Sequence, residues 1–322
     1  MKERYSQLSI ERLCGLFGKS RLAYYDRNRR KNAQIKDYTL VLEMVRLIRK
    51  DQPRIGTPKL HHMLKTKLEL EGIKMGRDGL HALLASYQMT VRPLRRYRPK
   101  TTWSDHWMRK WPNQIKDFQT NGPNQLWVSD ITYIRLKGDF CFLFLITDAY
   151  SHKIVGWALE MTMGHEGAIT ALKMALNQWK DRKDCLIHHS DRGSQYCCDN
   201  YVKTLQAAGI SVSMTQSGDP RENAVAERVN GILKVEMGLN VKFETLIGAK
   251  RASGRKIDIY NHDRPHLSCD MMAPAEAHQT SGPLKKRWKN TRTRNQRKEA
   301  QEKTTGSVAL PAGRATDPEV PV

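Results

Sequence analysis

Hydrophobic and polar positions divide the chain into a helical first part and a middle part rich in strands. Between residues 9 and 30, apolar side chains recur at helical spacing up to Gly18, and Ser20 can then cap a second helix. Residues 40–90 continue the helical pattern, with Thr57 as the expected N-cap of one helix. This pattern predicts a small all-α region of helix-turn-helix type, for which a plain helical hairpin is an equally good interpretation.

From about residue 120 the apolar positions follow the patterns of strands and short helices. Three strands are followed by a helix, a strand, a helix, a strand and a capped helix. They are expected at residues 124–136, 140–148, 152–160, 164–180, 185–191, 193–209, 210–215 and from 219 onward. This order predicts an α/β domain with a mixed five-stranded sheet and helices, the order of a ribonuclease-H-like core.

Charge is distributed unevenly along the 322 residues, which carry 55 Lys and Arg against 33 Asp and Glu. Residues 1–116 hold 27 basic and 10 acidic side chains, residues 117–279 hold 18 and 19, and residues 280–322 hold 10 and 4. Strongly basic ends around a neutral middle indicate a polyanionic partner, most simply a nucleic acid. A solubilising surface is the weaker alternative.

Four parts follow from these patterns. Residues 1–90 are expected to form a helical, helix-turn-helix-like DNA-binding region and residues 91–119 a basic linker. Residues 120–280 are expected to form the ribonuclease-H-like core. Residues 281–322 form a basic tail, rich in Gly, Pro, Thr and Ala, that we expect to be disordered.

Several other classes of protein are poor interpretations of this sequence. No run of about 18 apolar residues predicts a membrane helix, and no apolar core follows the first charges as in a secretory signal. Six scattered cysteines without a CxxC pair argue against a zinc knuckle or a disulfide framework and fit a reducing cytosol. No Walker loop or GxGxxG motif indicates ATP or NAD. We therefore expect a cytoplasmic protein.

Three acidic residues stand out by position. Asp130 lies in a strand built of Trp, Val, Ile and Tyr, where a carboxylate is costly without a partner such as a cation. Asp191 follows the fourth strand, and Glu227 lies in the last, capped helix. On that helix Glu222 is expected to complete a capping box, and Glu236 to lie on the surface.

Two Asp and one Glu from separate segments can converge on a pair of divalent cations. Their hard oxygen ligands suit Mg²⁺ or Mn²⁺, and two such ions promote in-line phosphoryl displacement without a protein nucleophile. Taken singly, each acid also has an ordinary interpretation, Asp191 as a turn former and Glu227 as an acid on a helix surface.

Basic residues outside the core are candidates for DNA contact. Lys74 and Arg77 lie near the start of a helix, where a recognition helix presents side chains to DNA. A solvated helix face is the alternative. In the linker, Arg95, Arg96 and Arg98 lie on both sides of Tyr97, and basic residues next to an aromatic one suit phosphate contact and base stacking.

The motifs WVSDITYIR, LITDAYSHKIVGWAL, HHSDRGSQY, SGDPRENAVAERVNGILK and YNHDRPHLSCDMMAP resemble the second-frame protein of IS3-family insertion sequences. That protein is the catalytic part of a DDE transposase related to retroviral integrases. The resemblance covers about residues 9–280, and 35 residues separate Asp191 from Glu227, as the family's DD(35)E signature requires.

The resemblance implies that Asp130, Asp191 and Glu227 are the catalytic and metal-binding triad, with two Mg²⁺ or Mn²⁺ ions as cofactors. It implies that Lys234 contacts the DNA end. The expected activity is cleavage at the terminal inverted repeats, followed by 3′-hydroxyl strand transfer into target DNA. Expected partners are DNA, further copies of this chain, and the product of an upstream reading frame, in a bacterial cell at the nucleoid.

Other residues also fit the family's motifs, and one segment departs from them. Asn223 and the segment 260–265 match, although a structural role for that segment is at least as good an interpretation as a DNA contact. After Glu227 this chain has Arg-Val-Asn where many members carry Ser-Phe-Phe. Two rival functions are a nuclease of the same fold that does not join DNA, and a non-catalytic DNA-binding regulator of the element.

Overall fold

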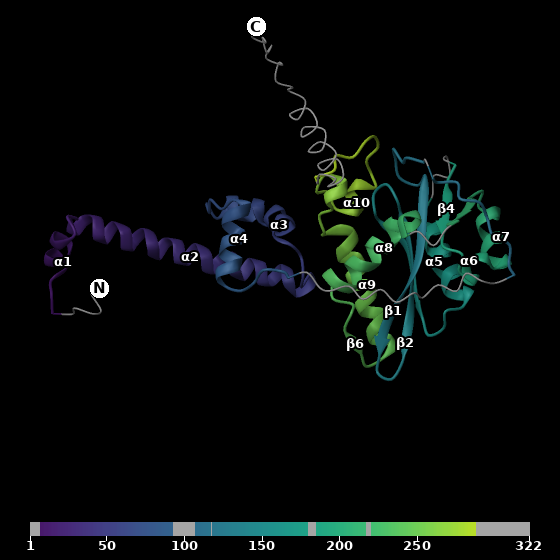
Figure 1. The fold of residues 1–322 in the computed structure, drawn as a ribbon, viewed down its shortest axis with the longest axis horizontal. Coiled ribbons are helices and arrows are strands. Elements are labelled where there is room, and N and C mark those ends of the chain that lie inside the picture. Colours follow the sequence, from purple (N-terminus) through teal and green to yellow (C-terminus); the bar gives the residue numbers. More distant parts are fainter. Residues whose placement is uncertain (1–6, 93–106, 117, 180–184, 217–219, 288–322) are drawn as a thin grey trace, which may run out of the picture.

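A computed structural model describes residues 7–92, 107–116, 118–179, 185–216 and 220–287. Within these residues a helical N-terminal part leads into an α/β part built on one sheet (Figure 1). Of the helices that the structure describes, none has the length and apolar character needed to cross a membrane.

The N-terminal part contains four helices. They are α1 (Ile10–Leu16), α2 (Arg21–Asp51), α3 (Thr57–Leu70) and α4 (Arg77–Ser86). Ser20 caps α2 as predicted, because its hydroxyl accepts a hydrogen bond from the main-chain N–H of Ala23 at 3.1 Å. The expected cap at Thr57 is wrong by one residue, since Gly56 takes the extended cap conformation and Thr57 already begins α3. The hydroxyl of Thr57 instead lies 3.4 Å from Nδ1 of His81.

Helix α2 divides into two halves with different surroundings. Its buried side chains begin at Val41, and from there it packs with α3 and α4 around a leucine-rich core. The first half of α2 and the short α1 project away from the other elements (Figure 1).

The α/β part is organised around a mixed sheet, and its five main strands were predicted from the sequence. They are β1 (Leu126–Leu136), β2 (Phe140–Asp148), β3 (Ile154–Glu160), β4 (Ile187–Ser190) and β5 (Ser211–Met214). Their order is β3-β2-β1-β4-β5, with antiparallel pairing from β3 to β1 and parallel pairing from β1 to β5. A two-residue strand, β6 (Lys242–Phe243), which the sequence did not predict, pairs with the end of β1.

Helices cover both faces of this sheet. On one face, α5 (His165–Gln178) and α7 (Asp199–Ala207) pack around Trp127 and Phe144. On the other face lie α8 (Ala224–Gly231), η2 (Ile232–Glu236) and α9 (Leu246–His262). Short turns of helix follow at Leu267–Cys269 and Pro274–Ala277. The arrangement is that of a ribonuclease-H-like core.

Two expected helices are divided in the structure. The helix predicted over residues 193–209 is split into α6 (Ser194–Cys197) and α7, because Cys198 between them adopts an extended backbone. The last helix starts as a 3₁₀ turn, Pro220–Asn223, continues as α8, and ends as the π-helical η2. The carboxylate of Glu222 accepts from the N–H of Gln216 at 2.6 Å. The cap expected at the start of this helix, at residue 219, lies outside the described residues, so the capping box stays a prediction.

The helical and α/β parts meet at the end of η2. The N–H of Arg54 donates to the carbonyl of Glu236 at 3.1 Å, and the Glu236 carboxylate pairs with Lys59 and with Arg264. The expectation that Glu236 lies on the surface is therefore wrong, since its side chain is only 14% exposed. A second contact joins Asp51 at the end of α2 to Arg255 on α9.

Candidate active site

The sheet register places Asp130 beside Asp191. In the parallel pair of β1 and β4, Val128 is opposite His189. Asp130 comes two residues after Val128, and Asp191 comes two residues after His189. After β4, the N–H of Gly193 donates to Oδ1 of Asp191 at 3.0 Å. Two carboxylates from neighbouring strands thus stand at the same level of the sheet.

Asp130 feels the charges of both other acids. Burial, as the largest cause, and the neighbouring carboxylate of Asp191 together raise the pKa of Asp130 to about 7, against hydrogen bonds from Asn230 and Ile131 that lower it. The charge of Glu227 on α8 also raises this pKa, with the smallest effect. Glu227 is exposed, so it forms the rim of the site. The structure therefore sets Asp191 beside Asp130, and Glu227 lies near enough for its charge to act on Asp130.

A row of polar contacts joins strand β1 to the segment that runs from the 3₁₀ turn η1 (Pro220–Asn223) to η2. Nδ2 of Asn223 donates to the carbonyl of Ser129 at 2.9 Å, and Nδ2 of Asn230 donates to Oδ2 of Asp130 at 2.7 Å. Nζ of Lys234 donates to Oγ1 of Thr132 at 3.2 Å. Lys234 therefore lies next to the acidic group, and burial is the largest cause that lowers its pKa, while Asp130 raises it.

Two histidines of β4 lie beneath the acids. They are His188 and His189, and both side chains are fully buried. Nε2 of His188 shares hydrogen bonds with Ser129 Oγ at 2.6 Å and with Tyr201 OH at 2.9 Å. Nδ1 of His189 bonds to Ser213 Oγ at 2.9 Å. Burial lowers their pKa values to about 3 and about 4, so both rings are uncharged near pH 7 and serve as hydrogen-bond partners in the core.

Tyr196 is a neighbour of the acids that the sequence did not single out. Burial raises its pKa well above the ordinary value, and the charges of Tyr201, Asp191 and Asp130 act in the same direction. Its hydroxyl is buried and has no hydrogen-bond partner among the described residues. Its position three residues after Gly193, close to Asp191 in the chain, was the available signal.

Comparison with known proteins assigns the chain to a family. Two models of the integrase core domain match residues 120–220 and residues 208–274. The uncharacterized 31 kDa protein of insertion element IS600 from Shigella sonnei is 33% identical over 267 residues, which cover 82% of this chain and 96% of that protein. Transposase InsF of insertion sequence IS3A from Escherichia coli K12 is 26% identical over 284 residues, which cover 86% and 96%. The chain belongs to the IS3 family of insertion-sequence transposases.

DNA transposition is therefore the function of this protein, and its integrase core places it among the polynucleotidyl transferases. Among solved structures, the catalytic core of HTLV-2 integrase in complex with magnesium aligns with 50% of the transposase and all of its own chain. The identity is 17% and the TM-score is 0.39.

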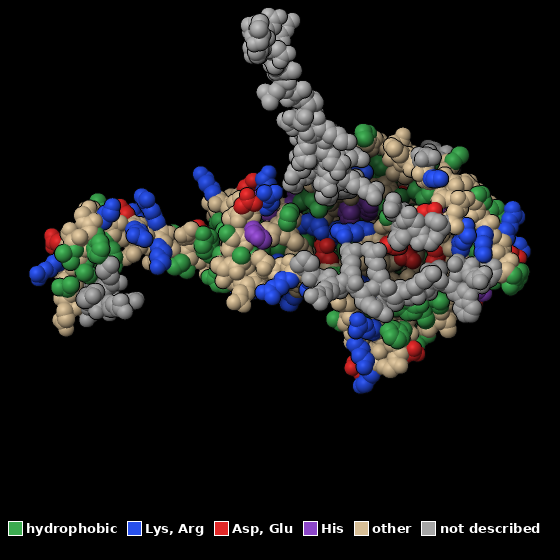
Figure 2. Space-filling model, in the orientation of Figure 1, with side chains coloured by type: hydrophobic (Ala, Val, Ile, Leu, Met, Phe, Trp, Pro, Cys, Tyr) green, Lys and Arg blue, Asp and Glu red, His purple; other side chains and the backbone are tan. Residues whose placement is uncertain are grey.

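The residues predicted to bind DNA are spread along the transposase. Lys74 and Arg77 are both exposed at the start of α4, and Arg77 pairs with Asp78 at 2.9 Å. Lys234 alone lies beside the acids. Arg95, Arg96 and Arg98 lie outside the described residues. Figure 2 shows further Lys and Arg side chains along the projecting helical part.

Two further motifs of the transposase have structural explanations. Asp148 shapes the turn after β2, because its carboxylate accepts from the N–H groups of Ser151 at 2.8 Å and Asn124 at 2.7 Å. In the segment 260–265, the Asn261 amide accepts from the N–H of Ile154 at 2.9 Å and donates to its carbonyl at 3.0 Å. It acts as a substitute strand partner at the start of β3.

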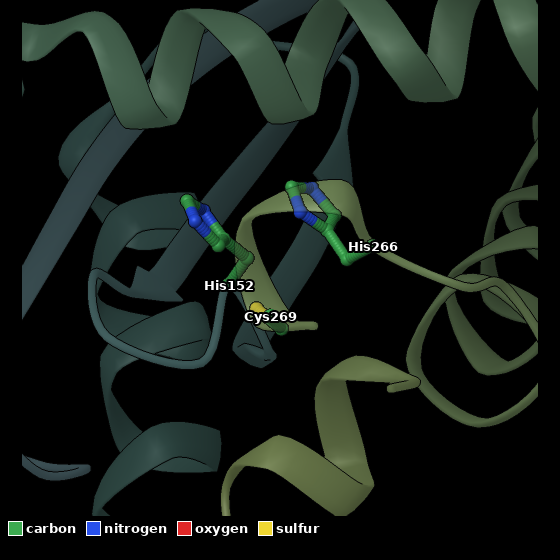
Figure 3. Close-up of side chains that lie close together, drawn as sticks. All are labelled: His152, His266 and Cys269. Carbon is green, nitrogen blue, oxygen red and sulfur yellow. The ribbon is translucent and has the colours of Figure 1, made fainter. Parts of the chain in front are cut away.

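One cluster outside the acidic site resembles a metal centre by composition. Among the described residues, His152, His266 and Cys269 hold possible ligand atoms within 4.8 Å of one another (Figure 3). The two rings are stacked, with centroids 4.4 Å apart and planes at 14°. Imidazole lone pairs lie in the ring plane, so nearly parallel rings direct them side by side and not toward one ion. The Cys269 thiol donates to the carbonyl of Ser151 at 3.4 Å, as in a packed core.

Proposed function

We propose that Asp130, Asp191 and Glu227 are the catalytic triad of this transposase and hold two Mg²⁺ or Mn²⁺ ions. The observation that carries this proposal is the register of β1 and β4, which sets Asp191 beside Asp130, with Glu227 on α8 near enough for its charge to act on Asp130. Grouped carboxylates without a cation repel one another, and hard oxygen donors of this kind fit small divalent cations. When bound, two such ions would activate the attacking oxygen and stabilise the leaving oxygen.

The fold gives the three acids different tasks. Asp130 lies within the central strand, and Asp191 follows a strand bonded to it, so both are fixed by the sheet. Glu227 belongs to a helix at the rim and is exposed, so in this proposal it completes the ligand set from the rim. Lys234, seven residues further along, would contact the phosphate backbone of the DNA end, and its bond to Thr132 on the strand of Asp130 supports this role.

The reaction runs in two balanced displacements at phosphorus. Water attacks the phosphodiester at the end of the element, which breaks the P–O3′ bond and leaves a free 3′-hydroxyl. That hydroxyl then attacks a second phosphodiester, forms a new P–O bond and releases another 3′-hydroxyl. The family implies an asymmetric first joining that leads to a circular intermediate, followed by integration.

The basic parts of the chain serve to hold DNA in this proposal. Lys74 and Arg77 on the helical part, and Arg95, Arg96 and Arg98 in the linker, would bind the terminal inverted repeats. Because two ends must be paired, the active form is an oligomer, assembled at the bacterial nucleoid. An upstream-frame product, fused or separate, is the expected protein partner.

Strand transfer in vitro tests this function. Purified protein and Mg²⁺ are mixed with labelled element ends, and joined products are compared with those of Glu227→Gln. Asp130→Asn and Asp191→Asn follow, and each should abolish joining while DNA binding stays nearly unchanged. Glu166→Gln, the same chemical change at an exposed helix position, is the matched control that should join normally.

The outcomes separate the rival functions. Cleaved but unjoined ends would indicate a nuclease. Binding without any cleavage, repeated with the upstream-frame fusion, would indicate a regulator. Retained joining in one of the three acid variants would remove that residue from the active site.

A further inference from the structure

Asn230 lies three residues after Glu227 on the same face of α8, and it is 6% exposed. Its Nδ2 donates to Oδ2 of Asp130 at 2.7 Å, across the contact between α8 and the central strand. The other oxygen of the same carboxylate, Oδ1, accepts from the N–H of Ile131 at 2.9 Å. Each oxygen of Asp130 thus has one fixed donor.

These two donors leave the carboxylate able to bind a cation. A carboxylate has about four acceptor sites on its two oxygens, so one hydrogen bond to each oxygen occupies only half of them. The last torsion of an Asp side chain is otherwise broad. The Ile131 donor belongs to the next residue of the same strand, so Asn230 is the contact that ties the carboxylate to a second element.

We propose that Asn230 is a positioning residue of the transposase, whose amide N–H holds the Asp130 carboxylate in the orientation that accepts a divalent cation. The inference rests on the proposed function, because it takes Asp130 as a metal ligand. Donors that orient ligating side chains typically change metal affinity by roughly 10- to 100-fold when they are removed.

Asn223 provides a matched control on the same segment. It is also buried, it also donates through Nδ2 to strand β1, and its Oδ1, like that of Asn230, has no partner among the described residues. Its acceptor, however, is the main-chain carbonyl of Ser129 and not a carboxylate. The two asparagines therefore differ in what they hold and not in how they are buried.

The experiment measures Mn²⁺ binding by the full chain without DNA. The melting temperature is followed against Mn²⁺ concentration, and each variant is compared with its own metal-free value, so that losses of stability do not enter. The variants are Asn230→Leu, which keeps the volume, Asn230→Ala, which avoids overpacking, Asn223→Leu and Asp130→Asn.

We expect both Asn230 variants to need roughly 10- to 100-fold more Mn²⁺ for half of the full shift. Asn223→Leu should start from a lower metal-free melting temperature and keep the wild-type Mn²⁺ dependence. Wild-type Mn²⁺ dependence in the Asn230 variants, or an equal loss in Asn223→Leu, would overturn the inference. An unchanged response in Asp130→Asn would instead contradict the metal site itself.

Discussion

Lys59 and Glu236 form an ion pair across the boundary of the helical and α/β parts, with Nζ 2.9 and 3.0 Å from the two carboxylate oxygens. They are 177 residues apart in the chain. Arg264, whose side chain is 1% exposed, donates to the same carboxylate from the other side. Burial would raise the pKa of Glu236, but Arg264 and Lys59 outweigh it and the pKa is lowered. Two buried cations thus share one carboxylate as their counter-charge.

Glu236→Gln should destabilise the folded protein strongly. The substitution keeps the shape of the side chain but leaves Lys59 and Arg264 without a counter-charge, and breaking a buried pair in this way costs about 3–5 kcal/mol. Denaturant unfolding measures the change. Glu244→Gln is the control, because its pair with Lys137 is about 70% exposed on both sides and should contribute little. Equal effects of the two substitutions would contradict a buried network.

The raised pKa of Asp130 predicts a pH dependence of stability without metal. The folded protein holds this proton up to about pH 7, whereas the ordinary value is 3.8, so the folded state binds the proton more tightly than the unfolded state. The free energy of unfolding therefore falls as pH rises between these two values. Asp130→Asn removes this titration. The free energy of unfolding of the variant, relative to that of the wild type, should therefore increase from about pH 5 to about pH 8.

Thermal unfolding in the presence of a chelator, at several pH values, measures that difference. Taking the difference between variant and wild type cancels the titration of the buried histidines. A difference that does not change with pH would show that Asp130 titrates normally in the folded protein.

Lys234→Ala should weaken DNA binding by a similar factor for element ends and for DNA of unrelated sequence, because a phosphate contact does not depend on the bases. A lysine that neutralises one phosphate contributes about one unit to the slope of log affinity against log salt, so the slope should fall by about one. Lys234→Arg should keep most of that slope. Lys242→Ala, an exposed lysine on β6, is the control. An unchanged salt slope in Lys234→Ala would place this lysine in a purely structural role beside Thr132.

Asn261→Ala tests whether the segment 260–265 supports the fold or contacts DNA. Removing the amide leaves the N–H and carbonyl of Ile154 without their partner at the start of β3, and each such group costs about 1–3 kcal/mol. The melting temperature should fall while end binding, measured well below it, stays unchanged. Lost binding with an unchanged melting temperature would support the DNA contact.

The local sequence pattern determined most of the architecture. Alternation and runs of apolar residues predicted β1 to β5, helical spacing predicted α5 and α8, and the cap at Ser20 was correct. These features depend on residues close together in the chain, so they can be found without the fold. The same holds for Asp130, since a carboxylate inside an apolar strand is already conspicuous in the sequence, whereas Asp191 and Glu227 stood out through their place in the element order and the family resemblance.

Only the tertiary structure decided which side chains surround these acids. The neighbours of a side chain come from distant segments, and the free energy of a polar group depends on whether those neighbours bury it and pair it. Asn230 on α8 donates to Asp130, and His189 is buried against Ser213. Glu236 is paired with Lys59 from α3 and with Arg264 from the segment after α9. Helical periodicity correctly separated Glu236 from the face of Glu227, but it could not show that Lys59 covers it.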